Sequence, residues 1–557
     1  MVEFVISNSL PPMDGVKSEI SKKTDAREDA DKTLRETEAS CDTPKKPLAF
    51  YLTFTGLIVA IFLYSLDATT LAVAIPYIAE DLGGSTLESF WASMSYILLV
   101  VLTQPLYTTF SDIFGRKPLL LAAFFFFGVG SLTFALAQNM TTIVAGRALQ
   151  GLGGGGLNVL SDIIVADMTT LEERSKYLGI MVLPIATGTL LGPFIGAWFT
   201  EFATWRWIGW VNLPLVGVAF PLVFFFLRLR TLEASFLTKL KSVDWGGVGL
   251  FAVGCVSFVL SLSWAGNLHV WGSWRTILPL IIGAMILAIF AIYESRPANP
   301  IVPHRLFHST TAIATLCGAF INGMIMFTLL QWLPLLYQSV MLQTLISSSL
   351  SQLPASIASI VAAIISLVAV GKIGKGYLMS LRVAWILMTI GSGLLILFDA
   401  DSSAGMRYGL PIIYGAGIGA LLRAIQLPMQ ASVPTVDDTG LAIGLMLSFR
   451  LLGGLVGQSI GSAIFSSVFA SSIKDIGVLP SSLMSLHANN AIGFIPKLRM
   501  LDLSSETLAP VLDAYLNSIR AIFYTTTALG ALGLFSSFFT KELSLQNSDL
   551  GRQRFEK

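Results

Sequence analysis

Long runs of apolar residues, separated by short polar segments, fill the chain between residues 51 and 540. An α-helix needs about 20 apolar residues to cross roughly 30 Å of hydrocarbon, and most of these runs have that length. The pattern therefore predicts fourteen membrane-spanning helices. Their expected ranges are 51–79, 90–109, 119–137, 141–165, 177–199, 207–227, 245–265, 276–293, 311–336, 350–370, 381–399, 408–430, 441–469 and 517–540.

The segments outside these runs are polar and mostly short, so neighbouring helices are expected to be antiparallel. Residues 1–47 have many charged and hydroxyl side chains and no apolar period, which is typical of a disordered tail, and no signal peptide is expected there. A second polar tail covers 541–557. Two connections are longer. The basic segment 228–244 is expected to lie on the surface, and 470–516 to carry a short amphipathic helix around Leu501–Leu516.

The distribution of Lys and Arg predicts the orientation of the spans, because cytoplasmic loops are enriched in basic residues. The side that holds both tails has 24 of them and the opposite side has 7, so both tails are expected in the cytoplasm. Four more lie within or at the ends of spans: Arg147, Arg382, Arg423 and Arg450. Asn139 begins a glycosylation sequon, but its outer loop is very short, which disfavours its use.

The composition supports a membrane protein and argues against several other classes. Of the 557 residues, 54% are hydrophobic and 12% are charged, whereas soluble domains have about 25% charged residues. The mean hydropathy is +0.73. A net charge of +1 gives no reason to expect nucleic-acid binding. The three cysteines form no CxxC pair and the four histidines no HExxH motif, so neither a metal site nor a cofactor is expected.

Asp67 lies in the middle of the first span, within Leu66-Asp67-Ala68-Thr69-Thr70. A carboxylate at this depth costs roughly 2.5–3.5 kcal/mol unless it faces a polar cavity, pairs, or takes up a proton. Burial disfavours the charged form, so a carboxylate placed here is suited to carrying a proton. The alternative is a structural Asp bonded to a neighbouring helix. Pro76 can break the same helix and free carbonyl groups toward a cavity.

A charged turn follows the second span, at Ser111-Asp112-Ile113-Phe114-Gly115-Arg116-Lys117. Gly115 permits the tight turn, and Asp112 with Arg116 and Lys117 can contact a neighbouring helix end. Such contacts can break when parts of the protein move apart. A basic anchor on the cytoplasmic side would explain the Arg and Lys but not the spacing of Asp and Gly.

Arg147 opens the fourth span in the motif Arg147-Ala148-Leu149-Gln150-Gly151. An arginine inside the membrane is expected to face the bundle interior, where it can influence a nearby carboxylate. Gly151, Gly153 and Gly156 spell GxGxxG, but no strand precedes them and they lie within a span, so a dinucleotide site is rejected. These small residues are expected instead to let helices pack closely.

Glycines recur every fourth residue in the fifth span, at Gly188, Gly192 and Gly196, next to Pro193. This spacing leaves one smooth helix face, and the proline is expected to bend the helix. A helix of this kind can pack tightly in one conformation and separate in another. The glycine spacing alone is a generic packing signal.

Together and in this order, these motifs resemble the major facilitator superfamily, specifically its 14-span drug:proton antiporters. The resemblance covers about 50–545 and is most similar to fungal toxin and multidrug efflux pumps. Thr108 and the second-half turn 371–375 depart from the family pattern, since the first replaces a glycine and the second lacks an acid. The matching residues are Leu66, Asp67, Thr69, Ala74 and Pro76; Asp112, Gly115, Arg116 and Lys117; Arg147, Gln150 and Gly151; Gly188, Gly192, Pro193 and Gly196; Trp205, Asn212, Asp244 and Trp245.

The resemblance implies a fold and a mechanism. The fold is an all-α major facilitator fold with 14 transmembrane helices, as six-helix bundles at 48–230 and 309–540 with two inserted helices in 231–308. Substrate would bind near the midplane between bundles that rock to give alternating access. Asp67 would carry the coupling proton and Arg147 would tune it. The residues expected to act in gating are Asp112, Gly115, Arg116, Lys117, Gly188, Gly192, Pro193 and Gly196.

The expected cavity is poor in fixed charge, because apart from Asp67 and a few arginines the deep span positions are apolar, amide or hydroxyl. Such a cavity suits lipophilic or amphipathic compounds. For each polar candidate taken singly, a hydrogen bond between helices is the preferred explanation. The candidates are Gln104, Asn158, Asn322, Gln331, Tyr414, Gln426 and Gln430.

These observations predict a proton-coupled antiporter that exports small lipophilic compounds, such as secondary metabolites or drugs. It is expected to be a monomer in the plasma membrane, or in a vacuolar or vesicle membrane. One alternative is a vacuolar basic amino-acid carrier or a siderophore transporter, and another is a membrane sensor or scaffold that transports nothing. An enzyme is not expected, because neither a nucleophile–base arrangement nor a phosphate-binding GxxxxGK[ST] motif is found.

Overall fold

The computed structural model describes residues 46–169, 171–229, 244–297, 302, 304–373, 377–433, 439–476, 483, 486–501 and 505–543. Nearly all of the expected N-terminal tail and of the connector 228–244, and most of the C-terminal tail, lie outside these residues. The chain divides into two units, residues 1–51 and 52–557, and every contact below is within the second. Within the described ranges the structure is helical and contains no strand, only one isolated bridge.

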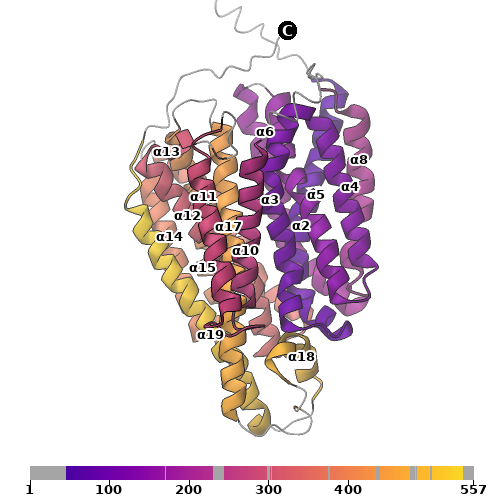
Figure 1. Cartoon of the computed structure of the whole chain (residues 1–557), viewed down its shortest axis with the longest axis vertical. Helices are drawn as coiled ribbons and strands as arrows, with labels where there is room; N and C mark the ends of the chain where they lie inside the picture. The colour runs from indigo at the N-terminus through magenta and orange to yellow at the C-terminus, as the bar shows by residue number, and fades with distance from the viewer. Residues whose placement is uncertain are drawn as a thin grey trace, which may run out of the picture. The chain divides into compact units, whose positions relative to one another are not determined.

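Three groups of helices follow one another along the chain (Figure 1). We call the first group the N-terminal bundle, the second the insert and the third the C-terminal bundle. The N-terminal bundle comprises α2 (Leu48–Asp81), α3 (Thr86–Phe114), α4 (Arg116–Ala135), α5 (Met140–Met168), α6 (Leu171–Phe202), α7 (Trp207–Trp210) and α8 (Asn212–Phe226). The insert comprises α10 (Trp245–Trp264) and α11 (Trp274–Tyr293). The C-terminal bundle comprises α12 (Thr310–Ser339), α13 (Leu345–Ile373), α14 (Tyr377–Leu394), α15 (Ala404–Ala424), α16 (Gln426–Ala431), α17 (Thr439–Ile476), α18 (Ala491–Leu498) and α19 (Ser505–Ser537).

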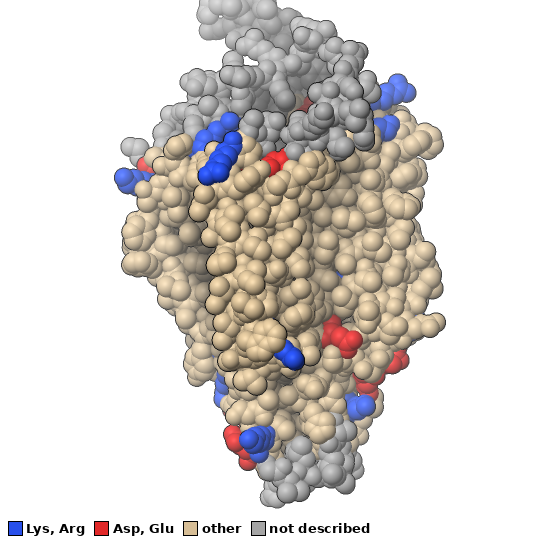
Figure 2. Space-filling view, viewed as in Figure 1, with Lys and Arg blue, Asp and Glu red and all other residues tan. Residues whose placement is uncertain are grey.

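The helices correspond to the predicted spans. Among the described residues, 13 helical segments are long and apolar enough to cross a membrane. The remaining expected span, 141–165, lies in α5, which has 29 residues but includes Arg147, Gln150, Asn158 and several glycines. The prediction of fourteen spans is therefore consistent with the structure. On the face shown in Figure 2, charged side chains gather toward the two ends and uncharged side chains cover most of the middle, as a lipid-facing surface requires.

Local sequence explains where several helices begin and end. Ser85 caps α3 in a capping box with Glu88, and the Asn139 side chain caps α5 by accepting from the Thr142 N–H. The sequon side chain is thus engaged in a helix cap. Gly115 separates α3 from α4 with a φ of 99°, a conformation that glycine adopts without strain.

Small residues set the packing of α5 in the N-terminal bundle, because both α3 and α4 lie directly against it. A Cβ atom on Gly153 would lie 2.5 Å from the carbonyl oxygen of Ala123 in α4, and one on Gly151 would collide with the carbonyl of Tyr96 in α3. The prediction that the glycines after Arg147 allow close packing is confirmed. No larger residue fits between these backbones.

One expected element lies elsewhere. The short amphipathic helix predicted around Leu501–Leu516 is instead α18, at Ala491–Leu498, and that prediction is wrong. Residues from Ser505 onward belong to the 33-residue helix α19, which continues into the last span. The hydrophobic pattern predicted two separate elements, whereas the amphipathic stretch and the apolar span form one continuous helix. At its other end the expected loop 470–516 is shortened by α17, which extends to Ile476.

Candidate functional site

Asp67 is buried at the centre of the N-terminal bundle with 1% of its surface exposed. Its carboxylate forms an ion pair with Arg147 of α5, whose Nη1 donates to Asp67 Oδ2. Asp67 Oδ1 accepts from Asn212 Nδ2 of α8 at 2.8 Å and from Gln150 Nε2 of α5 at 3.2 Å. The carboxylate therefore has hydrogen-bond donors from two helices besides its own, which is how a charge at membrane depth is stabilised.

The same network continues to α3 and α4. Arg147 donates through Nε to the Ala92 carbonyl at 3.2 Å, and its guanidinium lies 4.3 Å from the centre of the Tyr96 ring. Ser131 of α4 accepts from Gln150 Nε2 at 2.9 Å. We call Asp67, Ser131, Arg147, Gln150 and Asn212 the carboxylate network. It joins α2, α4, α5 and α8, so a change in the charge of Asp67 alters contacts on four helices.

Sequence reasoning predicted that Asp67 and Arg147 lie close together, and the structure brings them into contact. It did not assign roles to Ser131 or Asn212, although Asn212 was noted among the family matches. A polar residue at the start of the apolar run 212–226 was the available signal. The expectation that Asp67 is the single deep acid is wrong. Asp162, also in α5, is partly buried and has no hydrogen bond or ion pair in the described part of the chain.

The glycine face of α6 packs on α2 beside Asp67. A Cβ atom on Gly188 would collide with Ser65, one on Gly192 with Thr69, and one on Gly196 with the Thr70 carbonyl. Ser65 Oγ also donates to the backbone carbonyl of Pro184 in α6 at 3.1 Å. Because these α2 residues flank Asp67, any shift of α2 at the carboxylate network displaces α6 as well.

Pro193 connects this region to the other bundle, since its carbonyl accepts from Ser349 Oγ of α13 at 3.0 Å. Within the described residues, every hydrogen bond that joins the two bundles has its N-terminal partner among residues 73–94 or 193–201. These bonds run from Gln338 to Val73 O (3.1 Å), Arg499 to Tyr77 (3.1 Å), Thr86 to Ala488 O (2.8 Å), Ser93 to Gln331 (3.2 Å), Ser459 to Met94 Sδ (3.3 Å), Ser349 to Pro193 O (3.0 Å) and Ile346 N to Glu201 (3.1 Å).

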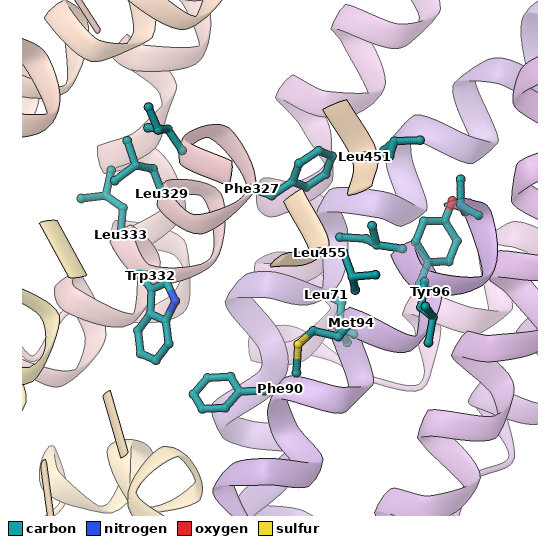
Figure 3. Close-up of a cluster of buried hydrophobic side chains, with 14 of the residues drawn as sticks. Leu71, Phe90, Met94, Tyr96, Phe327, Leu329, Trp332, Leu333, Leu451 and Leu455 are labelled. Atoms are coloured by element: carbon teal, nitrogen blue, oxygen red, sulfur yellow. The ribbon is translucent and has the colours of Figure 1, made fainter. Parts of the chain in front are cut away.

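Apolar side chains fill the same zone. Phe90 of α3 packs on Trp332 of α12 with ring centres 5.0 Å apart, and Leu451 and Leu455 of α17 belong to the same cluster of buried side chains as Met94 of α3 (Figure 3). The α2–α3 connection and the end of α6 belong to the side that the basic residues predict to be non-cytoplasmic. The two bundles therefore contact each other toward that side.

The charged turn lies at the opposite ends of the helices. Arg116 Nε forms an ion pair with Asp167 Oδ2 at the end of α5, at 3.1 Å, and Arg116 also donates to Ser111. Lys117 donates to the carbonyl of Leu227 at 2.9 Å. The turn thus ties α4 to α5 and α8 within one bundle. The Asp112 side chain lies outside what the structure describes.

The predicted cavity residues are distributed over both bundles and do not form one described pocket. Gln104 and Asn158 are buried in α3 and α5, whereas Tyr414 of α15 is buried in the C-terminal bundle. Gln331 bridges the bundles through Ser93. Gln426 accepts from Arg423 at 3.2 Å, and Gln430 is partly buried in α16. Asn322 is fully buried, and neither atom of its amide has a hydrogen-bond partner.

The family model and the similar proteins point to the same family. The model of the Major Facilitator Superfamily matches residues 57–458. The "MFS-type transporter sphD" of Aspergillus fumigatus is 52% identical, over 92% of this chain and 89% of that protein. The "Acurin A biosynthesis cluster MFS-type transporter" of Aspergillus aculeatus is 36% identical, over 72% and 73%. "Efflux pump FUS6" of Gibberella fujikuroi is 31% identical, over 94% of each.

Solved structures share the fold. An inward-facing, unoccupied bacterial homologue of the human lysosomal transporter Spinster superposes with a TM-score of 0.58 at 14% identity, covering 89% of this chain and 98% of its own. The inward-open xylose transporter XylE of E. coli gives a TM-score of 0.53 at 12% identity, covering 89% and 98%.

Proposed function

The chain belongs to the Major Facilitator Superfamily, and from this premise we propose that it exports small lipophilic or amphipathic compounds in exchange for protons. The family and the relatives indicate a multi-pass membrane transporter of small molecules rather than an enzyme. Export is supported by the names of two relatives, of which one is called an efflux pump and another belongs to a biosynthesis cluster. We further propose the plasma membrane as its location and a monomer as its functional form.

The position of the contacts between the bundles is the observation that carries this proposal. The bundles are joined through Val73, Ser93 and Pro193, all near the end predicted to be non-cytoplasmic. A transporter closed on that side presents its binding region to the cytoplasm, and in an exporter this is the state that loads substrate. Rocking of the bundles would then break these contacts and release the substrate on the other side.

The carboxylate network offers a means of coupling this motion to protons. Protonation of Asp67 would remove the charge that holds Arg147, and so weaken the attachment of α2 to α5 and α8. Since α2 packs on the glycine face of α6, and α6 contacts α13 through Pro193, this change would reach the contacts between the bundles. Asp67 is occluded in this conformation, so proton exchange requires the network to open.

The available driving force is sufficient for concentrative export. One proton moving through about 100 mV releases about 2.3 kcal/mol, and one pH unit adds about 1.4 kcal/mol. Their sum, about 3.7 kcal/mol, corresponds to a gradient of several hundredfold for a neutral compound at one proton per cycle.

The proposal is tested in two steps. A deletion strain is first screened against a compound panel, and compounds to which it is hypersensitive are then used with purified protein in proteoliposomes under an imposed pH gradient. We expect the Asp67→Asn variant to lose uphill transport but to keep equilibrative exchange, because it lacks the group that carries the proton. Its thermal unfolding is measured alongside, since Arg147 is left without its charged partner. Asp162→Asn is the matched control and should keep uphill transport. Undiminished uphill transport by Asp67→Asn would remove Asp67 from the mechanism.

A further inference from the structure

We propose that Arg450 of α17, assisted by Arg423 of α15, recognises an acidic group on the exported compound. The proposal rests on the proposed function and specifies the substrate class as amphipathic acids with a carboxylate or a comparable anion. It starts from a contrast between two arginines at membrane depth. Arg147 is paired with Asp67, whereas Arg450 has no ion pair within the part of the chain that the structure describes.

Arg450 is nearly buried, with 7% of its surface exposed, and its Nε and Nη2 atoms have no hydrogen-bond partner. An unpaired buried charge is unfavourable, so a partner is expected from outside the protein. Nε and Nη2 lie on the same edge of the guanidinium group. This edge binds both oxygens of a carboxylate at once, in a bidentate arrangement.

The described helices of the C-terminal bundle supply no carboxylate at the level of Arg450. The helices α12 to α16 contain neither Asp nor Glu, and the single acid of α17, Asp475, lies at its far end. In α19 the acids, Glu506 and Asp513, lie near its start. Among the described residues, Arg147 therefore has an internal counter-charge and Arg450 has none.

Two further groups make the site more favourable for an anion. Arg423 of α15 is a second cation within a span of the same bundle, and its Nη1 donates to Gln426. An anion held by both arginines would gain the attraction of two positive charges. Asn322 of α12 is fully buried with an unpartnered amide, and α12 touches the Arg450 backbone at the adjacent Gly323. Its Nδ2 is an additional donor near the same helix crossing.

The location fits a substrate that enters from the cytoplasm. Arg450 lies about a third of the way along α17 from its predicted cytoplasmic end, and Ser459, further along, contacts Met94 of the other bundle. The next residue, Leu451, lies in the apolar cluster between the bundles (Figure 3). A compound with its acid on Arg450 could thus place its apolar part against this cluster.

Equilibrium binding to the purified full-length protein tests the proposal without any pH gradient. The probes are 11-(dansylamino)undecanoic acid and its methyl ester, which differ in charge. We expect the wild-type protein to bind the acid at least about tenfold more tightly than the ester, because a hydrogen bond to a charged group changes a binding constant by about this factor or more. Arg450→Gln should lose this preference while its affinity for the ester stays unchanged. Arg450→Lys, which keeps the charge but lacks the bidentate edge, should keep part of it.

The matched control is Arg382→Gln, because Arg382 belongs to the same bundle but lies over the Phe538 ring. This variant should keep the full preference for the acid. Equal binding of acid and ester by the wild type, or an unchanged preference in Arg450→Gln, would overturn the proposal. Two further measurements use chloride and acetate as competitors of the long-chain acid. If chloride displaces this acid and acetate binds as tightly as it does, the apolar chain contributes nothing, and an inorganic anion site replaces the proposal. Proton-driven export of neutral compounds without acid preference would contradict only this inference, whereas acid preference without export would contradict only the proposed function.

Discussion

At the scale of single residues, the environment of each arginine decides its role more than its chemistry does. Arg147 and Arg450 both lie within spans and are both nearly buried. Arg147 has an internal carboxylate and stabilises the N-terminal bundle, whereas Arg450 has none in the described structure. Removal of one partner of a buried ion pair leaves an uncompensated charge, but removal of an unpaired charge does not.

This difference predicts opposite effects on stability. We expect Arg147→Gln to lower the free energy of unfolding by about 3–5 kcal/mol, because Asp67 is left charged without its partner. Arg450→Gln should leave stability unchanged or raise it. Thermal unfolding of both variants in the same detergent, without substrate, checks this. Equal destabilisation by the two changes would contradict the assignment of Arg450 as an unpaired charge.

At the scale of helices, α6 connects the region of Asp67 to the other bundle because glycines line the face that packs on α2. Gly188, Gly192 and Gly196 bring its backbone against α2 on either side of Asp67, while Pro193 offers its carbonyl to α13. The helix therefore contacts both the carboxylate network region and the opposite bundle. A single added methyl group is enough to test this role.

We expect Gly192→Ala to lower stability by about 1–3 kcal/mol and to reduce transport strongly, because the methyl group would collide with Thr69. The matched control is Gly179→Ala in the same helix, where no atom lies within 4 Å of the added Cβ. That variant should transport normally and be as stable as the wild type or slightly more, since alanine favours helices. Similar losses in both variants would indicate a general effect of replacing glycine in α6.

At the scale of the whole molecule, the contacts between the bundles correspond to one of the two states of the proposed transport cycle. They are concentrated near the predicted non-cytoplasmic side, where Ser93 donates to Gln331 and Phe90 packs on Trp332. Alternating access requires these contacts to break once per cycle. A covalent link across them should therefore hold the protein in this state.

We predict that Ser93→Cys with Gln331→Cys, in a background with the three native cysteines replaced by serine, loses transport when joined by a short bifunctional methanethiosulfonate reagent. Transport should return after reduction, because the link and not the substitutions causes the loss. Each single variant treated with the same reagent is the control. Full transport by the linked protein would show that the bundles do not separate there.

The sequence by itself determined the membrane class, nearly all of the spans and the proximity of Asp67 to Arg147. The class and the spans follow from a local property, since apolar length selects membrane helices, whereas the proximity of Asp67 to Arg147 was implied by the family resemblance. Family motifs added the arrangement in two bundles. The sequence pattern failed at 501–516, where an amphipathic stretch and a span form one continuous helix.

Only the tertiary structure decided which polar side chains have partners. Asn212 meets Asp67 from α8, whereas Arg450 and Asn322 meet no partner among the described residues, and nothing in their neighbouring sequence distinguishes these cases. Hydrogen bonding and charge pairing depend on distances of a few ångströms between helices far apart in the chain. Those distances are set by the packing of whole helices, so the unpaired arginine became visible only once the bundles were assembled.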